Sequence, residues 1–260
     1  MTLSLVNGGQ TSPIGIFPFD SVLDRTGRRQ LQNLISHVAA RRGQILAEQG
    51  EVDRDLLVLA EGVIKLLKVL PDGRRQIVAF RVAGDLVSLH RCDTPWPVTA
   101  QALSDCKLLR IDWEALRHLV GRYPAIDRAL LDLASDEIAN LQDRLLMLGR
   151  KTTEEKLASF ILEFGGLAAT PSSLSREIHL PMRRPEIAEY LGLTTESVSR
   201  EFSRFKRLRL IAMPRPSRIT VLNRPALEAI ALGASSSGAR SASSNPFDAR
   251  TKQQRTSAPG

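Results

Sequence analysis

Residues 183–206 constrain the fold of this chain more than any other segment. They read R-R-P-E-I-A-E-Y-L-G-L-T-T-E-S-V-S-R-E-F-S-R-F-K, so two amphipathic stretches flank Gly192. Pro185 suits the first turn of a helix, where its missing N–H is tolerated. Gly192 permits a tight turn that a side chain would resist. The segment predicts two short helices, of which the first buries Ile187, Ala188 and Leu191.

The second predicted helix has two chemically different faces. Thr194 is a good N-cap for it, and Glu196 lies near its positive end. Val198, Phe202 and Phe205 recur at i, i+4 and i+7 and form an apolar stripe. A second face carries polar side chains at i, i+3, i+4 and i+7, namely Glu196, Ser199, Arg200 and Ser203.

This polar face has the groups that read DNA base edges. Arginine binds guanine in a bidentate manner, glutamate accepts from cytosine, and serine does either. Two helices joined by a tight turn form a helix-turn-helix, whose second helix enters the major groove. We therefore predict base contacts by Glu196, Ser199 and Arg200. The candidates for base or phosphate contacts are Thr195, Ser203, Arg204, Arg183, Arg184, Lys206, Arg215 and Arg218.

The charge distribution supports this interpretation. The 260 residues carry a formal net charge of +8. Nine basic residues stand against four acidic ones between Arg183 and Arg218, so most of the excess is concentrated here, as phosphate contact requires. The alternative is a basic but merely solvated helical hairpin. The turn glycine, the cap and the sequence L-I-A-M-P-R-P-S-R-I-T-V-L, which predicts a two-stranded wing, favour DNA binding.

The rest of the chain predicts an α+β protein. Short apolar runs between about residues 44 and 113 are separated by turn signals such as P-D-G-R, which indicates an antiparallel β-roll. Apolar residues at helical spacing predict a long helix from Ala125 to Leu148, ended by Gly149, whose stripe packs on its own domain, a partner copy or both. Thr152 and Glu155 have the spacing of a capping box.

These patterns divide the chain into five predicted parts. Residues 165–173 are expected to form a loop, and the last segment has little to bury. The parts are a partly ordered N-terminal segment (1–27), a β-roll domain (28–120), a long helix (121–150), a winged helix-turn-helix domain (151–232) and a disordered tail (233–260).

The segment 180–206 resembles the DNA-binding signature of the Crp/Fnr superfamily of bacterial transcription regulators. The stretches E-G-V-I-K-L-L-K-V-L-P-D-G-R-R-Q-I-V-A-F-R-V-A-G-D-L-V and T-A-Q-A-L-S-D-C-K-L-L-R-I resemble the β-roll of that family. The resemblance covers about residues 28–230. It implies a cyclic-nucleotide-binding-like roll and a homodimer joined through the long helix, with the interface residues Ile126, Leu130, Leu133, Ile138, Leu141, Leu145 and Leu148.

The spacing of Glu196, Ser199 and Arg200 looks like the E-x-x-S-R of the Fnr/FixK branch. That branch implies a palindrome of the TTGAT–N4–ATCAA type. Arg200 would then contact guanine, Glu196 an amino group of the opposite strand, and Ser199 the thymine side. Two positions depart from the family. Arg209 stands where glycine is frequent, which costs about 1 kcal/mol if the backbone is left-handed, and Arg183 stands where a Ser or Thr cap is frequent.

The residues discriminate among the effectors that the family implies. Cyclic AMP requires an Arg-Ser pair, whereas Pro97 and Val98 occupy about those positions. An iron–sulfur cluster requires four cysteines, and this chain has two, Cys92 and Cys106. His90 lies close to where the haem-containing member carries its iron ligands, so haem remains open alongside a structural role for this histidine.

No cofactor is predicted, and the preferred hypothesis is a regulator that needs no small ligand. Cys92 and Cys106 are candidate redox-sensitive thiols, although Cys106 sits in an apolar strand pattern that favours a buried, inert thiol. A haem- or redox-responsive sensor built on His90 or these thiols is the alternative.

The predicted function is sequence-specific transcription regulation, with activation as the expected sign. The expected partners are double-stranded DNA, a second copy of the chain and RNA polymerase. Nucleophile elbows, phosphate loops and metal-ligand clusters are lacking in the sequence, so an enzyme is not expected. No apolar run reaches the roughly 20 residues of a membrane helix, and two cysteines suggest a reduced compartment. We therefore expect a cytoplasmic protein.

Overall fold

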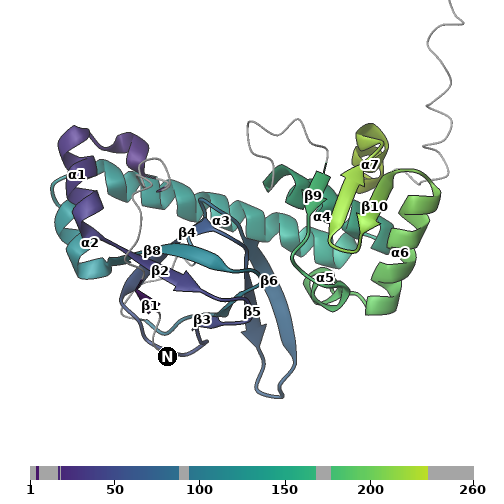
Figure 1. Ribbon diagram of the computed structural model, residues 1–260, viewed down its shortest axis with the longest axis horizontal. Coiled ribbons are helices and arrows are strands. Elements are labelled where there is room, and N and C mark those ends of the chain that lie inside the picture. Colours follow the sequence, from purple (N-terminus) through teal and green to yellow (C-terminus); the bar gives the residue numbers. More distant parts are fainter. Residues whose placement is uncertain (1–3, 6–16, 18, 88–93, 168–176, 234–260) are drawn as a thin grey trace, which may run out of the picture.

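The computed structural model describes residues 4–5, 17, 19–87, 94–167 and 177–233. Two antiparallel sheets form the N-terminal half, a long helix runs along them, and a smaller helical region with its own sheet lies at the far end of that helix (Figure 1). This arrangement confirms the predicted α+β fold with an N-terminal roll and a C-terminal helix-turn-helix region.

The roll consists of two four-stranded sheets. In the first the order is β1-β2-β8-β4, and in the second it is β3-β7-β5-β6. The P-D-G-R turn joins β5 to β6 as predicted, with Gly73 at φ 84° and the Leu70 N–H donating to the Arg74 carbonyl at 2.8 Å. The strands are β1 (Ser4–Leu5), β2 (Ile35–Ala40), β3 (Ile45–Ala47), β4 (Asp55–Glu61), β5 (Ile64–Val69), β6 (Arg75–Arg81), β7 (Thr99–Ala102) and β8 (Cys106–Asp112).

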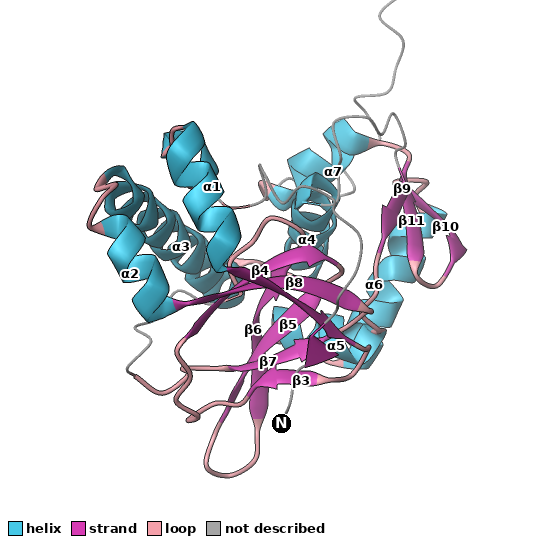
Figure 2. Cartoon of the chain, turned by 60° about the vertical axis from the view of Figure 1, so that its left-hand side comes forward, coloured by secondary structure: helices cyan, strands magenta, loops and turns pink. Residues whose placement is uncertain are grey.

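Strand alternation divides the apolar side chains between two cores. Successive side chains of a strand point to opposite faces. In β4, Leu57 and Leu59 therefore pack inside the roll, while Leu56 and Val58 pack against helices on the outer face of the first sheet. The second sheet divides its side chains in the same way, and its outer face meets the C-terminal region (Figure 2).

Helices cover the outer face of the first sheet. The short η1 (Asp20–Val22) precedes α1 (Arg25–Leu34), and α2 (Trp113–Val120) follows β8 directly. The helix α1 was not predicted; it begins at Asp24, whose carboxylate accepts from the Gly27 N–H at 2.6 Å. The N-terminal part is therefore more helical than the sequence pattern indicated.

The long helix α3 spans Ala125–Arg150, close to the prediction, but it passes through Gly149 instead of ending there. The next helix, α4 (Thr153–Leu167), begins with the predicted capping box, since the Thr152 N–H donates to the Glu155 carboxylate at 3.1 Å and the Glu155 N–H donates to the Thr152 hydroxyl at 3.3 Å. The predicted loop starts too early, because Gly165 and the next two residues are still helical.

The C-terminal region contains the predicted helix pair and a three-stranded sheet of order β10-β11-β9, one strand more than the predicted wing. The predicted tail after Gly233 lies outside the described residues. No helix in the described ranges is long and apolar enough to cross a membrane. The elements are β9 (Glu177–His179), α5 (Arg184–Leu191), α6 (Thr195–Arg207), β10 (Ile211–Arg215), β11 (Arg218–Val221) and α7 (Arg224–Ala231).

Candidate DNA-binding interface

The turn between α5 and α6 has the geometry that the glycine predicted. Gly192 is left-handed, at φ 61° and ψ 43°, and its N–H donates to the Ala188 carbonyl. The N–H of Leu193 reaches the same carbonyl at 3.0 Å. Both bonds satisfy groups that a helix end leaves open. The turn thus fixes the angle between the two helices.

The helix α6 begins and packs as predicted. The hydroxyl of Thr194 accepts from the Ser197 N–H at 3.1 Å, which is an N-cap bond. Val198, Phe202 and Phe205 are at most 2% exposed and join the core of the C-terminal region. Burying this stripe turns the opposite face of α6 outward.

The three predicted base-reading side chains lie on that outward face. Glu196, Ser199 and Arg200 are all exposed. The Arg200 guanidinium donates to the Ser197 hydroxyl at 3.3 Å. Ser197 was not predicted as a site residue, although its i, i+3 spacing from Arg200 was available. It restrains the guanidinium while leaving it accessible to a ligand.

Two further candidates on α6, Ser203 and Arg204, differ in their contacts. The Ser203 hydroxyl donates to the Ser199 carbonyl at 3.0 Å, so it is held by its own helix. Arg204 is half-buried and lies 3.0 Å from the Glu154 carboxylate of α4 and 3.3 Å from that of Glu201. Arg204 therefore fastens α6 to α4, which sequence spacing within one helix did not reveal.

The remaining basic candidates lie around the helix pair. Arg183, Lys206 and Arg215 are exposed, and Arg215 is the last residue of β10, next to the turn to β11. Arg218 is exposed too, and it lies 3.1 Å from the Glu177 carboxylate of the neighbouring strand β9. Most of the predicted basic residues thus surround α6.

The two departures from the family pattern have clear local structures. Arg209 has φ 55°, the one positive value among the described non-glycine residues, so the left-handed backbone considered for this position is present. Arg183 sits just before α5, and its N–H donates to the Glu186 carboxylate at 2.8 Å. Glu186 thus supplies one half of a capping box, and a Ser or Thr at position 183 would supply the other half by accepting from the Glu186 N–H.

The predicted dimerisation residues of α3 divide into three groups by their exposure. Ile138, Leu141 and Leu145 are 58%, 47% and 71% exposed. Ile126 is fully buried in the core of its own chain, which corrects its assignment to an interface. Leu130, Leu133 and Leu148 are half-buried, and two exposed residues that were not predicted, Leu131 and Leu146, are 67% and 61% exposed.

Of the three sensor candidates, Cys106 lies among the described residues. His90 and Cys92 lie outside the described residues. Cys106 is 3% exposed on β8, and burial raises the pKa of its thiol despite hydrogen bonds to Ser104 and Val63. The indole of Trp96, 2% exposed, is among the side chains inside the roll.

Two family models match this chain. The cyclic nucleotide-binding domain matches residues 37–123, and the Crp-like helix-turn-helix domain matches residues 155–230. The first match covers the roll and the second covers the helix pair and the small sheet. The two models thus follow each other in the order that the structure shows.

Similar proteins give the same assignment. The chain is 35% identical over 204 residues to the fumarate and nitrate reduction regulatory protein of Salmonella typhi, covering 78% of this chain and 81% of that protein. It is 35% identical to the nitrogen fixation regulation protein FixK of Azorhizobium caulinodans, covering 73% and 76%. The solved structure of FixK2 from Bradyrhizobium japonicum matches with a TM-score of 0.70 at 29% identity, covering 75% and 96%. The chain belongs to the Crp/Fnr family of DNA-binding transcription regulators.

Proposed function

We propose that this regulator is a FixK-like activator that binds a TTGAT–N4–ATCAA-like palindrome as a homodimer, without a cyclic nucleotide or an iron–sulfur cluster. The observation that carries the proposal is the exposed face of α6, on which Glu196, Ser199 and Arg200 stand opposite a fully buried apolar stripe. An arginine, a glutamate and a serine on one accessible helix face suit hydrogen bonding in the major groove.

The exposed surface of α3 supports a homodimer. Leu131, Ile138 and Leu145 recur every seven residues and are 67%, 58% and 71% exposed. Leu141 and Leu148 occupy the intermediate positions of the same heptads. Such a seam packs against a second helix of the same kind in a coiled coil. A dimer would present two copies of α6 to half-sites about one turn of DNA apart.

Among the described residues of the roll, those at about the positions of the family's phosphate-binding pair do not fit a cyclic nucleotide. Val98 is half-buried and packs against the apolar interior, and Pro97 is exposed, so neither supplies a cation for a phosphate. The indole of Trp96 and aliphatic side chains such as Leu57, Leu59 and Leu66 occupy the interior. Burying a nucleotide phosphate among them would be costly.

An iron–sulfur cluster does not fit either. The chain has two cysteines, and Cys106 is buried inside the roll rather than placed on a surface loop. The raised pKa of the Cys106 thiol disfavours the thiolate, which is the form that binds iron and reacts with oxidants. The alternative sensor therefore rests on His90 and Cys92. An absorption spectrum of the purified protein tests whether haem is bound.

Activation in the bacterial cytoplasm, through contact with RNA polymerase, is the expected mode of action. A relative that is 33% identical over 205 residues is the transcriptional activatory protein AadR of Rhodopseudomonas palustris. Transcription from a promoter with the palindrome upstream, reconstituted with purified polymerase and this protein, tests the sign. Increased transcript supports activation, and decreased transcript indicates repression.

Selection of duplexes from a random library tests the DNA specificity. The additive-free protein is incubated with the library at near-physiological salt, and the bound fraction is sequenced. We expect enrichment of two inverted TTGAT half-sites separated by four base pairs. Enrichment of single half-sites would contradict the homodimer, and enrichment without shared sequence would contradict base reading by α6.

A further inference from the structure

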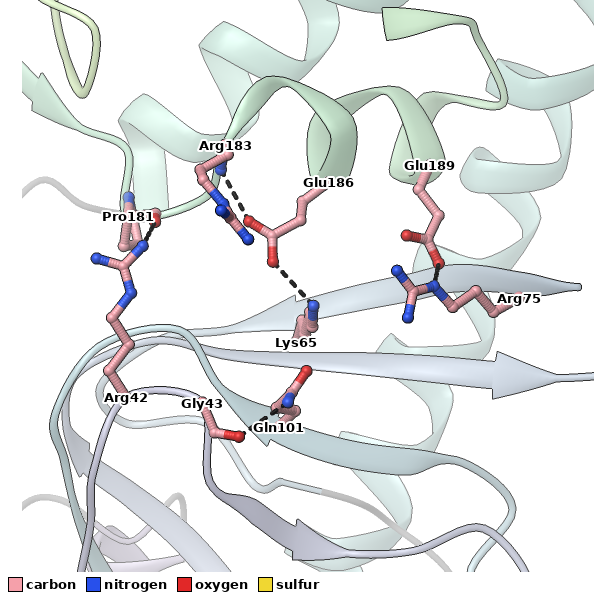
Figure 3. Close-up of polar contacts among 9 residues, drawn as sticks. All are labelled: Arg42, Gly43, Lys65, Arg75, Gln101, Pro181, Arg183, Glu186 and Glu189. Carbon is pink, nitrogen blue, oxygen red and sulfur yellow. Dashed lines mark hydrogen bonds and ion pairs between the residues drawn. The ribbon is translucent and has the colours of Figure 1, made fainter. Parts of the chain in front are cut away.

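Strand alternation places a lysine on the side of the roll that faces the DNA-binding region. In β5, Ile64 and Leu66 point into the roll, so Lys65 and Leu67 point outward. The Lys65 side chain is nevertheless only 9% exposed, because α5 covers it (Figure 3). A lysine in such a place requires a partner for its charge.

That partner is Glu186 in the first turn of α5. The Lys65 ammonium lies 2.8 Å from one carboxylate oxygen, and the Glu186 side chain is 12% exposed. The other oxygen accepts from the Arg183 N–H at 2.8 Å. One carboxylate therefore caps the first helix of the helix-turn-helix and binds the roll at the same time (Figure 3).

Contacts along the rest of α5 continue this attachment. Arg75 of β6 lies 3.4 Å from the Glu189 carboxylate, one helical turn beyond Glu186. The Gln76 side chain donates to the carbonyls of Glu189 and Tyr190. Just before α5, the guanidinium of Arg42, which lies between β2 and β3, donates to the Pro181 carbonyl at 3.4 Å (Figure 3). Strands β5 and β6 thus bind α5 at both of its ends.

Apolar contacts join the same two surfaces. The ring centroid of Phe80 in β6 lies 4.7 Å from that of Tyr190 in α5, and those of Phe160 and Phe164 in α4 are 6.3 and 6.1 Å away. These side chains form one core cluster that extends from the outer face of β6 into the DNA-binding region. Apolar contact is non-directional, whereas the ion pair specifies one relative placement of the two surfaces.

We propose that the Lys65–Glu186 ion pair is a positioning contact that holds the helix-turn-helix on the roll in the orientation competent for DNA binding. The docked face is that of α5, and the base-reading residues of α6 stay exposed while the pair is formed. The orientation that an effector would otherwise set is then built into the chain. This inference rests on the proposed effector-independent function.

Removing one charge of the pair leaves the other charge unpaired in a buried site, which disfavours the docked arrangement. If docking falls to about one-tenth of the molecules, the apparent affinity for a site that requires docked domains falls about tenfold. The affinity of an isolated helix-turn-helix for one half-site is unaffected, because α6 itself is unchanged. Comparing the affinity for the palindrome with the affinity for a half-site therefore distinguishes a contact that positions the helix-turn-helix from one that touches DNA directly.

The test compares Lys65→Met and Glu186→Gln in the full chain with Lys107→Met. Lys107 pairs with Glu61 at 2.9 Å, but its side chain is 68% exposed on the roll, so this control removes the same charge away from α5. Anisotropy measures affinity for the TTGAT–N4–ATCAA duplex and for a half-site duplex. Hydrogen exchange of residues 64–81 and 184–191 measures docking without DNA.

We expect both interface variants to exchange faster in these segments and to bind the palindrome about tenfold more weakly, with unchanged half-site affinity. The double variant is expected to lose no more than either single variant, because both act on one pair. Exchange equal to that of Lys107→Met would overturn the inference, as would faster exchange with equal or tighter palindrome binding. Wild-type protein without preference for the palindrome would contradict the proposed function, while the exchange comparison would still decide the docking contact.

Discussion

The guanidinium of Arg184 lies on the ring of Phe202, with Cζ 3.4 Å from the ring centroid. Nη2 of the same group lies 3.3 Å from the Met213 sulfur, and burial lowers the pKa of Arg184 to about 10. This arginine of α5 therefore holds α6 and β10 in place. We therefore expect a structural role for Arg184 instead of the predicted base or phosphate contact.

Arg184→Met separates these two roles. We expect a loss of about 1–2 kcal/mol in the free energy of unfolding, because the cation–π contact is lost, and little change in the dependence of DNA affinity on salt. Arg183→Met, at an exposed neighbouring position, is expected to reduce the salt slope by about 1 without loss of stability. The reverse pattern would identify Arg184 as the phosphate contact.

Arg200→Ala tests base reading. We expect it to lose about 1–3 kcal/mol of discrimination at one base pair of each half-site, because a bidentate guanine contact disappears. Arg215→Ala, at the exposed end of β10 in the small sheet, is the control and is expected to weaken binding to all sequences alike. Affinities for single-base variants of the palindrome provide the measurement. Uniform weakening by Arg200→Ala would show that this residue contacts only phosphate.

Leu145→Glu tests the heptad seam of α3. Leu145 is 71% exposed and lies in the seam, whereas Leu146 is 61% exposed and lies next to it on the helix. A carboxylate in an apolar coiled-coil seam is costly, so we expect Leu145→Glu to sediment as a monomer. Leu146→Glu is expected to remain a dimer. Equal behaviour of the two variants in sedimentation equilibrium would contradict the proposed seam.

The left-handed backbone at Arg209 predicts an order of stabilities. Glycine adopts φ 55° without strain, and its gain is partly offset by the greater freedom of the unfolded chain. We expect Arg209→Gly to be more stable by about 0.5 kcal/mol, and Arg209→Val to be less stable by about 1 kcal/mol because its branched side chain resists this conformation. Urea denaturation that ranked valine above glycine would contradict this order.

The Glu186 pair predicts a pH dependence of stability. Burial opposes ionisation of this carboxyl, but Lys65 and the Arg183 N–H outweigh it and lower the Glu186 pKa below 4.5. A lowered folded-state pKa gives stability that is present above the unfolded value and is lost as pH falls through the folded value. The difference in unfolding free energy between wild type and Glu186→Gln should therefore be full at pH 7 and shrink below about pH 4.5. A constant difference would contradict the ion pair.

The local elements were predictable because their signals are local. The apolar stripe of α6, the Thr194 cap and the Gly192 turn each depend on residues a few positions apart, and the structure has all three. The helix α1 was missed because it contains Gly27. Tyr123, distant in the sequence, lies so close that a Cβ on Gly27 would be 2.9 Å from its ring.

Contacts between distant segments account for the rest. The sequence of α6 made Arg204 a candidate for base or phosphate contact, but its guanidinium lies 3.0 Å from the Glu154 carboxylate of α4. In the same way, β5 reads as a strand with an exposed lysine until α5 covers Lys65. Which surfaces of two elements meet depends on tertiary packing, and a pattern within one element does not contain that information.

Equilibrium binding of the additive-free protein to DNA tests whether this regulator recognises its palindrome without an effector. Fluorescence anisotropy at near-physiological salt compares the TTGAT–N4–ATCAA duplex with a scrambled duplex of equal composition, after an absorption spectrum has excluded bound haem. We predict an affinity for the palindrome at least about a thousandfold tighter than for the scrambled duplex, the lower end of specific recognition. Equal, weak binding to both duplexes would contradict an effector-independent, base-reading regulator.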